Sequence, residues 1–467
     1  MFSIQYQGTS TLMQKAINRY LKQFFLFGQS TVGSSLTLTL TVQDESGSLY
    51  LGVDESYTLT ASSSGASLNS TTVFGAMKGL ETFSQLLDWS SPSSTYLLSR
   101  LPLQISDAPR FPWRGLLIDS SRHFLPVSAI KRQIDALSYT KLNTLHWHIT
   151  DAQSFPIYSA SYPNLSAKGA YAPSAIYSTA EVQDIISYGY ERGVRVVPEF
   201  DIPGHAASWG ASDPALVVNC TKYNHNINNI PLDPTKEHTY EVLSGFLNEM
   251  SKMFLDAVHV GGDEIVFGCW ESDPAVSSWM KQHGMTTGVE LAQYFEDRLF
   301  NSVLPSTKQI VVWQDLFDNG VQIPNNTIIQ VWSDVADLKT VTSSGFKGLI
   351  SAGWYLNEQV PVPGSTHGDF MDTWMDFYLN EPTNGLTPEE ASLVLGGEGC
   401  IWGEHVDGLV LDAMVWPRTV AIAERLWSSV DVTSTTQAKP RIQEMSCRLQ
   451  QRGIGSAPLL PGFCLVP

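Results

Sequence analysis

The chain has 467 residues, enough for a barrel of about 250 residues and a smaller domain. Its 28 Lys and Arg residues against 46 Asp and Glu residues give a formal net charge of -18, which disfavours nucleic acid, anionic membrane surfaces and polyanionic substrates as partners. No apolar run approaches the roughly 18 residues of a membrane-spanning helix, so we predict a globular protein without a membrane span.

Residues 1–107 are predicted to form a small α+β domain. Apolar and polar residues alternate in SLTLTLTV (35–42) and SYTLTAS (56–62), which predicts strands. In TTVFGAMKGLETFSQLLD (71–88) the apolar residues recur at helical spacing. The sequence pattern changes at the segment ISDAPRFPWRG (105–115), after which β-branched runs alternate with amphipathic stretches. Residues 108–467 form the second predicted domain.

The second domain contains eight short β-branched runs, separated by amphipathic stretches such as VSAIKRQIDALSYTK, TAEVQDIISYGYERG and GVELAQYFEDRLFNSVL. Eight βα units are the number at which a parallel barrel closes, so we predict a (β/α)8 TIM barrel with a C-terminal helix and tail. A doubly wound open sheet is the alternative, but its Gly-rich phosphate-binding turn is missing after the first run. The predicted strands are RGLLIDS (114–120), NTLHWHI (143–149), VRVVPEF (194–200), AVHVGG (257–262), QIVVWQ (309–314), TIIQVW (327–332), GLISAGW (348–354) and LVLGGEG (393–399).

Polar and aromatic residues close these runs, which is where barrel enzymes carry their catalytic groups. Carboxylates dominate the first four ends and tryptophans the last four, which suits a sugar pocket because indoles pack on apolar ring faces and carboxylates bind hydroxyls. A single strand-end aromatic is often core packing, but four in register favour a site. The residues are Asp119, Asp151, Glu199, Asp201, His205, Asp263, Glu264, Trp313, Trp332, Trp354, Tyr355, Trp402 and Glu404.

The motif HVGGDE (259–264) closes the fourth run with two glycines and two adjacent carboxylates. Glycine lets the backbone approach a ligand closely. Neighbouring strand residues point to opposite faces, so Asp263 and Glu264 can serve one pocket only where the chain is leaving the strand. Glycosidases that use two carboxylates usually take them from separate strands, so this pair favours two different roles on one side of a substrate. A solvated acidic turn is the alternative interpretation.

The chain resembles the β-N-acetylhexosaminidases of glycoside hydrolase family 20, the eukaryotic lysosomal and secreted members above all, in HVGGDE, RGLLIDSSRHFLP, HWHITDAQSFP, EFDIPGH, SAGWYLN and CIWGEHVD. The resemblance runs from about residue 71 to the C-terminus. It implies an exo-acting, retaining hydrolase of terminal GlcNAc or GalNAc that uses no cofactor and works by substrate-assisted catalysis. Glu264 would protonate the leaving oxygen and later activate water. Asp263 would orient and stabilise the 2-acetamido group as it forms an oxazolinium ion, and Tyr355 would donate a hydrogen bond to its carbonyl oxygen.

The resemblance also implies the residues that bind the sugar. Arg114 and Glu404 would hold its outer hydroxyls, between walls formed by Trp313, Trp332, Trp354 and Trp402. Supporting or substrate-binding positions would be Asp151, Asp201 and His205. A purely structural link or a metal site are the alternatives for these three, although no close-spaced ligand pair such as HExxH is present.

The residues after Tyr355 bear on substrate charge. Asn357 would lie at the pocket rim, and Glu358 stands where the family members that accept charged substrates carry Arg. Neutral sugars are therefore expected, unless Glu358 points to solvent.

The cysteines fit the family pattern, which implies the disulfides Cys220–Cys269 and Cys447–Cys464 and leaves Cys400 as a buried free thiol. Asn-x-Ser/Thr sequons predict glycosylation and a lysosomal or extracellular location; they begin at Asn69, Asn164, Asn219 and Asn325. The start MFSIQYQ has neither a basic n-region nor an apolar h-region, so either a leader has been trimmed or the chain starts late. The N-terminal domain is only loosely similar to the family and is expected to lack its leading part.

Two other functions stay open at this point. A conventional glycosidase of the same fold would need no 2-acetamido group, and a catalytically silent glycan-binding barrel would need no general acid. The joint presence of Asp263, Glu264 and Tyr355 favours the enzyme. The lysosomal relatives are dimers, so a homodimer is one expectation, while the choice between GlcNAc and GalNAc, and the linkage, stay open.

Overall fold

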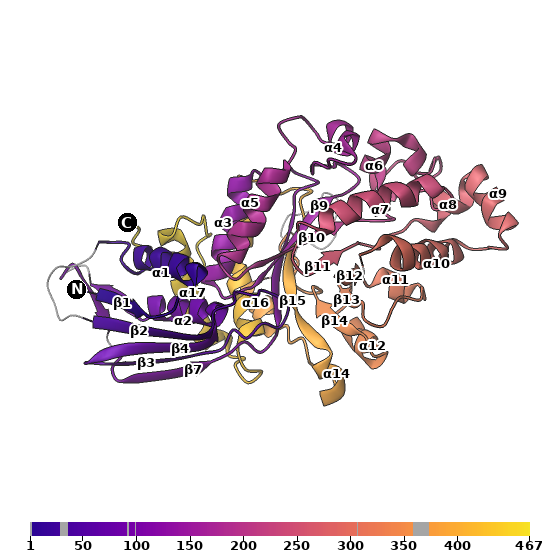
Figure 1. Ribbon diagram of the computed structural model, residues 1–467. Coiled ribbons are helices and arrows are strands. Elements are labelled where there is room, and N and C mark those ends of the chain that lie inside the picture. The colour runs from indigo at the N-terminus through magenta and orange to yellow at the C-terminus, as the bar shows by residue number, and fades with distance from the viewer. Residues whose placement is uncertain (1, 29–35, 91–92, 99, 306, 358–372) are drawn as a thin grey trace.

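The computed structural model describes residues 2–28, 36–90, 93–98, 100–305, 307–357 and 373–467. Two large sheets organise these residues, a five-stranded open sheet near the N-terminus and a closed eight-stranded barrel (Figure 1). Among the described residues, no helix combines the length and the apolar character needed to cross a membrane.

The N-terminal sheet has the strand order β1-β2-β4-β3-β7 and packs against two helices. The predicted strands at 35–42 and 56–62 and the predicted helix at 71–88 are confirmed as β2, β3 and α2. Leu38, Leu40, Leu59 and Leu68 alternate with exposed residues and are buried beneath the helices. The elements are β1 (Phe2–Tyr6), α1 (Thr11–Phe24), β2 (Leu36–Asp44), β3 (Tyr57–Ser62), β4 (Gly65–Thr72), α2 (Val73–Gln85), β5 (Leu87–Ser90), β6 (Thr95–Leu98) and β7 (Leu103–Asp107).

All eight predicted barrel strands are confirmed, and they close in the order β10-β11-β12-β13-β14-β15-β8-β9. Every neighbouring pair is parallel. Such strands are covered on both faces, which explains why their sequences are nearly continuous apolar runs. The strands are β8 (Trp113–Asp119), β9 (Thr144–Thr150), β10 (Arg195–Phe200), β11 (Ala257–His259), β12 (Gln309–Trp313), β13 (Ile328–Val331), β14 (Lys347–Ile350) and β15 (Val394–Ile401).

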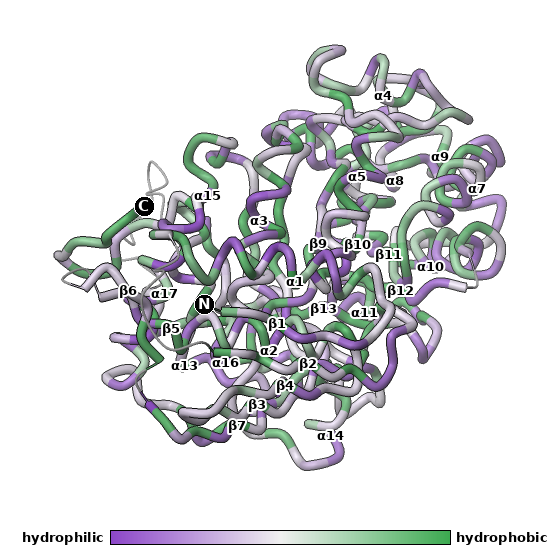
Figure 2. The backbone as a smooth tube through the Cα atoms, turned by 60° about the vertical axis from the view of Figure 1, so that its left-hand side comes forward, coloured by the Kyte–Doolittle hydropathy of each residue, from purple (hydrophilic) through white to green (hydrophobic). Residues whose placement is uncertain are grey.

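Amphipathic helices surround the barrel, and hydrophobic and hydrophilic stretches alternate along α3 and α7 in Figure 2. Capping boxes formed by Ser178 with Glu181 and by Thr287 with Glu290 fix where two of them begin. The helices are α3 (Val127–Tyr139), α4 (Pro163–Gly169), α5 (Thr179–Tyr190), α6 (Ala207–Ser212), α7 (Glu237–Ser251), α8 (Phe267–Ser272), α9 (Pro274–Gln282), α10 (Gly288–Arg298), α11 (Asp315–Asp318), α12 (Asp337–Ser343), α13 (Trp374–Leu379), α14 (Pro388–Ser392), α15 (Leu411–Val415), α16 (Arg418–Trp427) and α17 (Thr435–Gln451).

Side chains inside the barrel form layers, as expected when alternate residues of every strand point inward. The lowest layer is apolar and consists of Trp113, Val197, Ala257, Val311, Ile328 and Leu349. Above it lies a buried polar layer of His146, Glu199, His259, Gln330 and Glu398. Leu117, Trp313 and Cys400 lie above these, and Cys400 is a buried free thiol as predicted.

Both predicted disulfides are confirmed. Cys220–Cys269 joins the segment after β10 to α8, and Cys447–Cys464 fastens the C-terminal tail to α17. A closed loop of this second size contributes about 3 kcal/mol through chain entropy. The four sequon asparagines are all exposed.

Arg114 lies at the amino end of β8, at the bottom of the barrel, where the N-terminal domain packs. Its Nη2 is 2.7 Å from Oε2 of Glu55, which precedes β3, and Lys78 Nζ is 3.3 Å from Oε1 of the same carboxylate. All three side chains are at most 2% exposed. The prediction that Arg114 binds the sugar is therefore wrong, because the carboxyl ends of the strands lie at the other end of the barrel.

We expect Arg114→Met to lower the free energy of unfolding by about 3–5 kcal/mol, because Glu55 then loses a buried partner. Urea unfolding would measure the loss. The double variant Arg114→Met/Glu55→Gln should not regain it, since buried Lys78 then loses the carboxylate it is paired with. Equal stabilities of the wild type and Arg114→Met would contradict this account of the domain interface.

Candidate active site

A pocket of 270 Å³ opens at the carboxyl ends of the barrel strands. Except for Arg122, every residue that lines it was singled out in the sequence. The lining residues are Arg122, His205, Asp263, Glu264, Trp313, Trp332, Tyr355, Asn357, Trp402 and Glu404.

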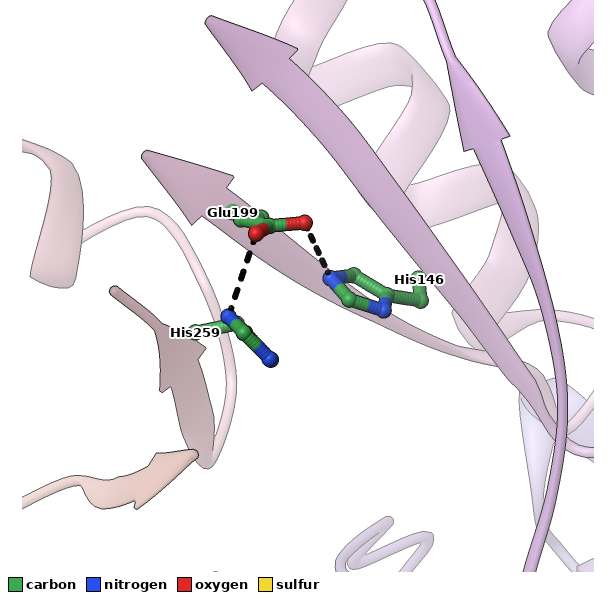
Figure 3. Close-up of side chains that lie close together, drawn as sticks. All are labelled: His146, Glu199 and His259. Carbon is green, nitrogen blue, oxygen red and sulfur yellow. Dashed lines mark ion pairs between the residues drawn. The ribbon is translucent and has the colours of Figure 1, made fainter. Parts of the chain in front are cut away.

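The polar layer beneath the pocket begins a chain of alternating carboxylates and imidazoles. Glu398 Oε1 is 2.5 Å from His146 Nδ1, and His146 Nε2 is 3.0 Å from Glu199 Oε2 (Figure 3). Burial opposes the charged imidazole, but Glu398 and Glu199 outweigh it and raise the pKa of His146 to about 9. His146 is therefore an imidazolium held between two carboxylates.

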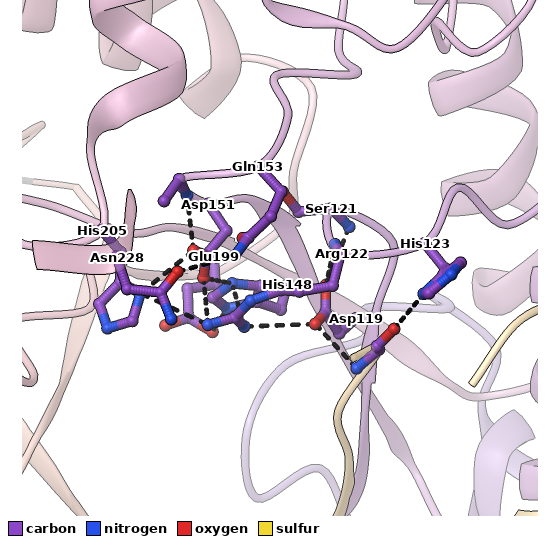
Figure 4. A network of polar contacts seen from close by, with 12 residues as sticks. Asp119, Ser121, Arg122, His123, His148, Asp151, Gln153, Glu199, His205 and Asn228 are labelled. Atoms are coloured by element: carbon purple, nitrogen blue, oxygen red, sulfur yellow. Dashed lines mark hydrogen bonds and ion pairs between the residues drawn. The ribbon is translucent and has the colours of Figure 1, made fainter. Parts of the chain in front are cut away.

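The chain continues from Glu199 towards the pocket. Glu199 Oε2 is 2.6 Å from His148 Nδ1, and His148 Nε2 is 2.8 Å from Asp151 Oδ2 (Figure 4). Asp151 Oδ1 is in turn 3.1 Å from His205 Nδ1. Burial alone would raise the pKa of Asp151, yet Arg122 and His205 hold it well below its usual range.

His205 carries the chain to the two adjacent carboxylates. Its Nε2 lies 3.2 Å from Glu264 Oε2 and 3.9 Å from Asp263 Oδ2. Burial opposes protonation, but Asp151 and Asp201 raise the pKa of His205 well above its ordinary value. We call the series Glu398, His146, Glu199, His148, Asp151, His205 and Glu264 the buried chain.

Asp263 and Glu264 face one pocket because the backbone turns sharply after β11. Gly261, Gly262 and Glu264 have φ values of +70°, +94° and +49°. The chain has therefore left the strand, as both carboxylates require. An L residue in this left-handed region costs about 1–2 kcal/mol, so Glu264 is a strained position at the site.

The adjacent carboxyl groups titrate in opposite directions. Burial raises the pKa of Asp263 to about 7, against the opposing charge of His205. The hydrogen bond from His205 lowers the pKa of Glu264 below its ordinary value. Of the two carboxyl groups, Asp263 therefore holds a proton more readily than Glu264.

Histidines and carboxylates in the barrel also invite a test for a metal site, because ligand atoms of His146, Glu199 and His259 lie within 4.8 Å of one another. His146 already directs both ring nitrogens at carboxylates. The Gly261 N–H donates to His259 Nδ1 at 3.0 Å, which occupies the lone pair that faces Glu199. This arrangement does not fit a cation, because the His146 imidazolium has no lone pair to offer and the Gly261 N–H occupies that of His259 Nδ1.

Aromatic side chains form the pocket walls and contact the buried chain. The Trp313 indole N–H donates to Glu199 Oε1 at 2.7 Å. Trp402 packs edge-on against His148, with ring centroids 5.0 Å apart, and Tyr355 packs at right angles to Trp402. The pocket walls are thus held in place by contacts with Glu199 and His148, which are members of the buried chain that ends at Glu264.

Arg122 is the pocket residue that sequence reasoning missed. It follows the end of β8, and its two terminal nitrogens are 3.2 Å from Asp119 Oδ2 and 2.7 Å from Asp151 Oδ2. Burial opposes its charge, but Asp151 and Asp119 raise the pKa of Arg122. Its position could have revealed it, because barrel enzymes carry functional groups just after the carboxyl ends of their strands and Arg122 lies three residues beyond Asp119, where β8 ends.

Three further predicted sugar contacts do not reach the pocket. Trp354 is fully buried in the outer core and its indole N–H donates to the Phe377 carbonyl at 3.0 Å. Asp151 and Asp201 are each 1% exposed and lie behind the lining residues. Those three predictions of direct binding are wrong. Glu358 lies outside the described residues.

Comparisons with known proteins give one answer for both domains. Residues 111–430 match the model of the glycosyl hydrolase family 20 catalytic domain, and residues 3–86 match a domain described as beta-acetyl hexosaminidase like. The β-hexosaminidase subunit A1 of Dictyostelium discoideum is 42% identical over 97% of this chain and 85% of its own length. The human β-hexosaminidase subunit beta is 38% identical over 97% of the chain and 83% of its length.

Solved structures agree. A chitobiase of Flavobacterium johnsoniae superposes with a TM-score of 0.82 at 30% identity, over 97% of this chain and 70% of its own. An exo β-N-acetylglucosaminidase of Vibrio harveyi in complex with N-acetylglucosamine has a TM-score of 0.81 at 23% identity, over 98% and 74%, which speaks for the fold alone.

We expect Gly261→Ala to destabilise the protein more than Gly284→Ala. Both glycines have positive φ values, but a Cβ at Gly261 would lie 1.9 Å from Asp201 Oδ1, whereas no heavy atom lies within 4 Å of one at Gly284. The backbone cost of about 1–2 kcal/mol is common to both, and the collision is additional at Gly261. Urea unfolding of the two variants would measure the difference, and equal losses would contradict the close approach of Asp201.

Proposed function

Because the chain belongs to glycosyl hydrolase family 20 and is a hydrolase of the β-N-acetylhexosaminidase type, we propose that it removes terminal GlcNAc or GalNAc from glycans by a retaining, substrate-assisted reaction. One observation carries the proposal: two adjacent carboxyl groups, Asp263 and Glu264, face one small aromatic pocket. A volume of 270 Å³ is at the small end of ligand pockets and suits a single terminal sugar, hence exo action.

Glu264 is the proposed general acid and base. It gives its proton to the leaving oxygen as the C1–O bond breaks, and later takes a proton from the water that attacks C1. The hydrogen bond from His205 supports this role because it orients the carboxyl group. A bound sugar displaces water from Glu264, which favours the neutral acid over the carboxylate.

Asp263 is the proposed partner of the 2-acetamido group. The carbonyl oxygen of that group attacks C1, and the positive charge that develops on the amide is stabilised by the Asp263 carboxylate as an oxazolinium ion forms. Tyr355 would donate to the carbonyl oxygen from the opposite wall. Water then opens the ring at C1 and regenerates the acetamido group with retained configuration.

We assign to Arg122 the role that the resemblance implied for Arg114. Its guanidinium lines the pocket together with Glu404, so that a donor and an acceptor are available for the sugar's outer hydroxyls. Arg122 also lies 5.1 Å above the Trp402 ring, which fixes it beside a wall. We assign Trp313, Trp332 and Trp402 to the sugar's apolar faces and Asn357 to the rim.

The acidic surface and the disulfides support action on neutral glycans in the secretory pathway, in a lysosome or outside the cell. The four exposed sequon asparagines are proposed glycosylation sites. We propose no cofactor, and a homodimer is the assembly to test first.

We expect Glu264→Gln to retain binding but to lose about 10²–10⁴-fold in kcat on substrates with poor leaving groups, because the proton donor is gone. Activated aryl leaving groups need less acid help, so their first step should suffer less. Steady-state kinetics on a natural disaccharide and a nitrophenyl glycoside would compare the two. Equal losses on both would remove Glu264 from the acid role.

Asp263→Asn should slow hydrolysis of N-acetylglucosaminides by about 10²-fold or more, because the developing positive charge loses its carboxylate. A thiazoline that mimics the oxazolinium should inhibit the wild type and bind this variant more weakly. Kinetics and inhibition on chromogenic N-acetylglucosaminide, with the glucoside as control, would measure both. Wild-type turnover of the variant, or efficient hydrolysis of the glucoside, would point to a conventional glycosidase instead.

A further inference from the structure

Asp315 lies at the start of α11, directly after β12, and its two carboxylate oxygens accept hydrogen bonds from two different parts of the site. Oδ1 accepts from the Glu264 backbone N–H at 3.1 Å. Oδ2 accepts from the Trp332 indole N–H at 2.7 Å. One side chain therefore joins the backbone of the acid to a wall of the pocket.

The neighbouring residue holds the same tryptophan by its main chain. Gln314 Oε1 accepts from the backbone N–H groups of Trp332 at 2.7 Å and of Ser333 at 3.0 Å. Trp332 is thus bound at its backbone by Gln314 and at its indole by Asp315. Its ring has little freedom left, although it forms a partly exposed pocket wall.

The bond to Glu264 acts where the backbone is strained. Glu264 has a φ of +49°, which only a surrounding structure that holds it can maintain. Its N–H donates to a carboxylate, and such charge-assisted bonds are stronger than those between neutral groups. Asp315 therefore helps to fix the direction in which the Glu264 side chain leaves the backbone.

Asp315 also adds negative charge beside the second carboxyl group. Burial raises the pKa of Asp263 to about 7, His205 opposes this, and Asp315 reinforces it. The charged groups that act on Asp263 are His205, Asp315, Glu199 and Glu264. Loss of the Asp315 charge would lower the pKa at which the Asp263–Glu264 pair gives up its proton.

We propose that Asp315 is a positioning residue for hydrolysis, which sets the Glu264 backbone and the Trp332 wall in one geometry. The proposal rests on the function proposed above. It predicts that binding and proton transfer depend together on a residue that touches neither the sugar nor the bond that breaks.

The test begins with Asp315→Asn. Asparagine offers one acceptor oxygen, and its amide NH2 would face the second donor, so one of the two bonds is lost and the other is no longer charge-assisted. We expect kcat/KM on a chromogenic N-acetylglucosaminide to fall about 10- to 100-fold, with a higher KM from the loosened wall and a lower kcat from the displaced acid. Asp334→Asn is the matched control. Among the described residues, this exposed carboxylate near Trp332 accepts one hydrogen bond, from the Ala336 N–H, so the change should leave kinetics unchanged.

Trp332→Phe separates the two functions, because it keeps an aromatic wall but removes the indole donor. It should raise KM and leave kcat within about twofold. The double variant should have the same KM as Trp332→Phe alone, since the hydrogen bond between residues 315 and 332 is already absent there. Melting temperatures of all variants would show whether any loss is due to unfolding.

The pH profile provides a readout that a merely structural role would not move. The pair gives up its proton at a lower pH when Asp315 is neutral, so the alkaline limb of kcat/KM should move down by about half a unit to one unit in Asp315→Asn. The limb should stay in place in Trp332→Phe, which keeps the charge.

Additive effects on KM, wild-type kinetics of folded Asp315→Asn, or an unmoved alkaline limb would each overturn the positioning role. A wild-type protein that does not hydrolyse the N-acetylglucosaminide would instead overturn the proposed function. The two failures are therefore distinguishable in the same assay.

Discussion

Pairing of buried charges is the constraint on which the barrel interior depends. Glu199 is fully buried, and burial alone would raise its pKa, but His148 and the other histidines around it hold the pKa well below its usual range. An unpaired charge at that depth would cost several kcal/mol, so the residues on neighbouring strands have to match. The match extends from Glu398 to Glu264 along the buried chain. The pairs that offset the cost of burying these charges therefore also orient the groups at the pocket.

The two ends of the barrel divide stability from chemistry, as barrels commonly do. At the amino ends of the strands, the Glu55 carboxylate forms buried ion pairs with Arg114 and Lys78, and these join the N-terminal domain to the barrel. At the carboxyl ends, a comparable buried guanidinium, Arg122, joins Asp119 and Asp151 beside an open pocket. Arg114, at the amino end of β8, thus stabilises the domain interface, and Arg122, just beyond the carboxyl end of the same strand, lies at the pocket.

The sequence predicted the architecture well because it depends on local patterns. Eight β-branched runs and the helices between them identified every barrel strand, and strand ends identified most of the pocket. Contacts between distant segments were not predictable. Trp354 directs its indole at Phe377 in α13, which no local pattern reveals, and Arg114 was chosen although it enters its strand at the wrong end. Asp315 carries no motif at all, because its importance comes from two donors 51 residues before it and 17 residues after it.

The double use of Glu199 limits how this enzyme could be redesigned. Its Oε1 accepts from the Trp313 indole in the pocket wall, while its Oε2 contacts His146 and His148 in the buried chain. Exchange of Trp313 for a smaller residue, to admit a bulkier sugar, would strip a buried carboxylate oxygen of its donor. Because Glu199 belongs to the buried chain that leads to Glu264, a change of Trp313 made to alter substrate range would also alter the pH dependence of activity. Asn357 and Glu404 also line the pocket but are not members of the buried chain, so substrate range could be altered there without a change to that chain.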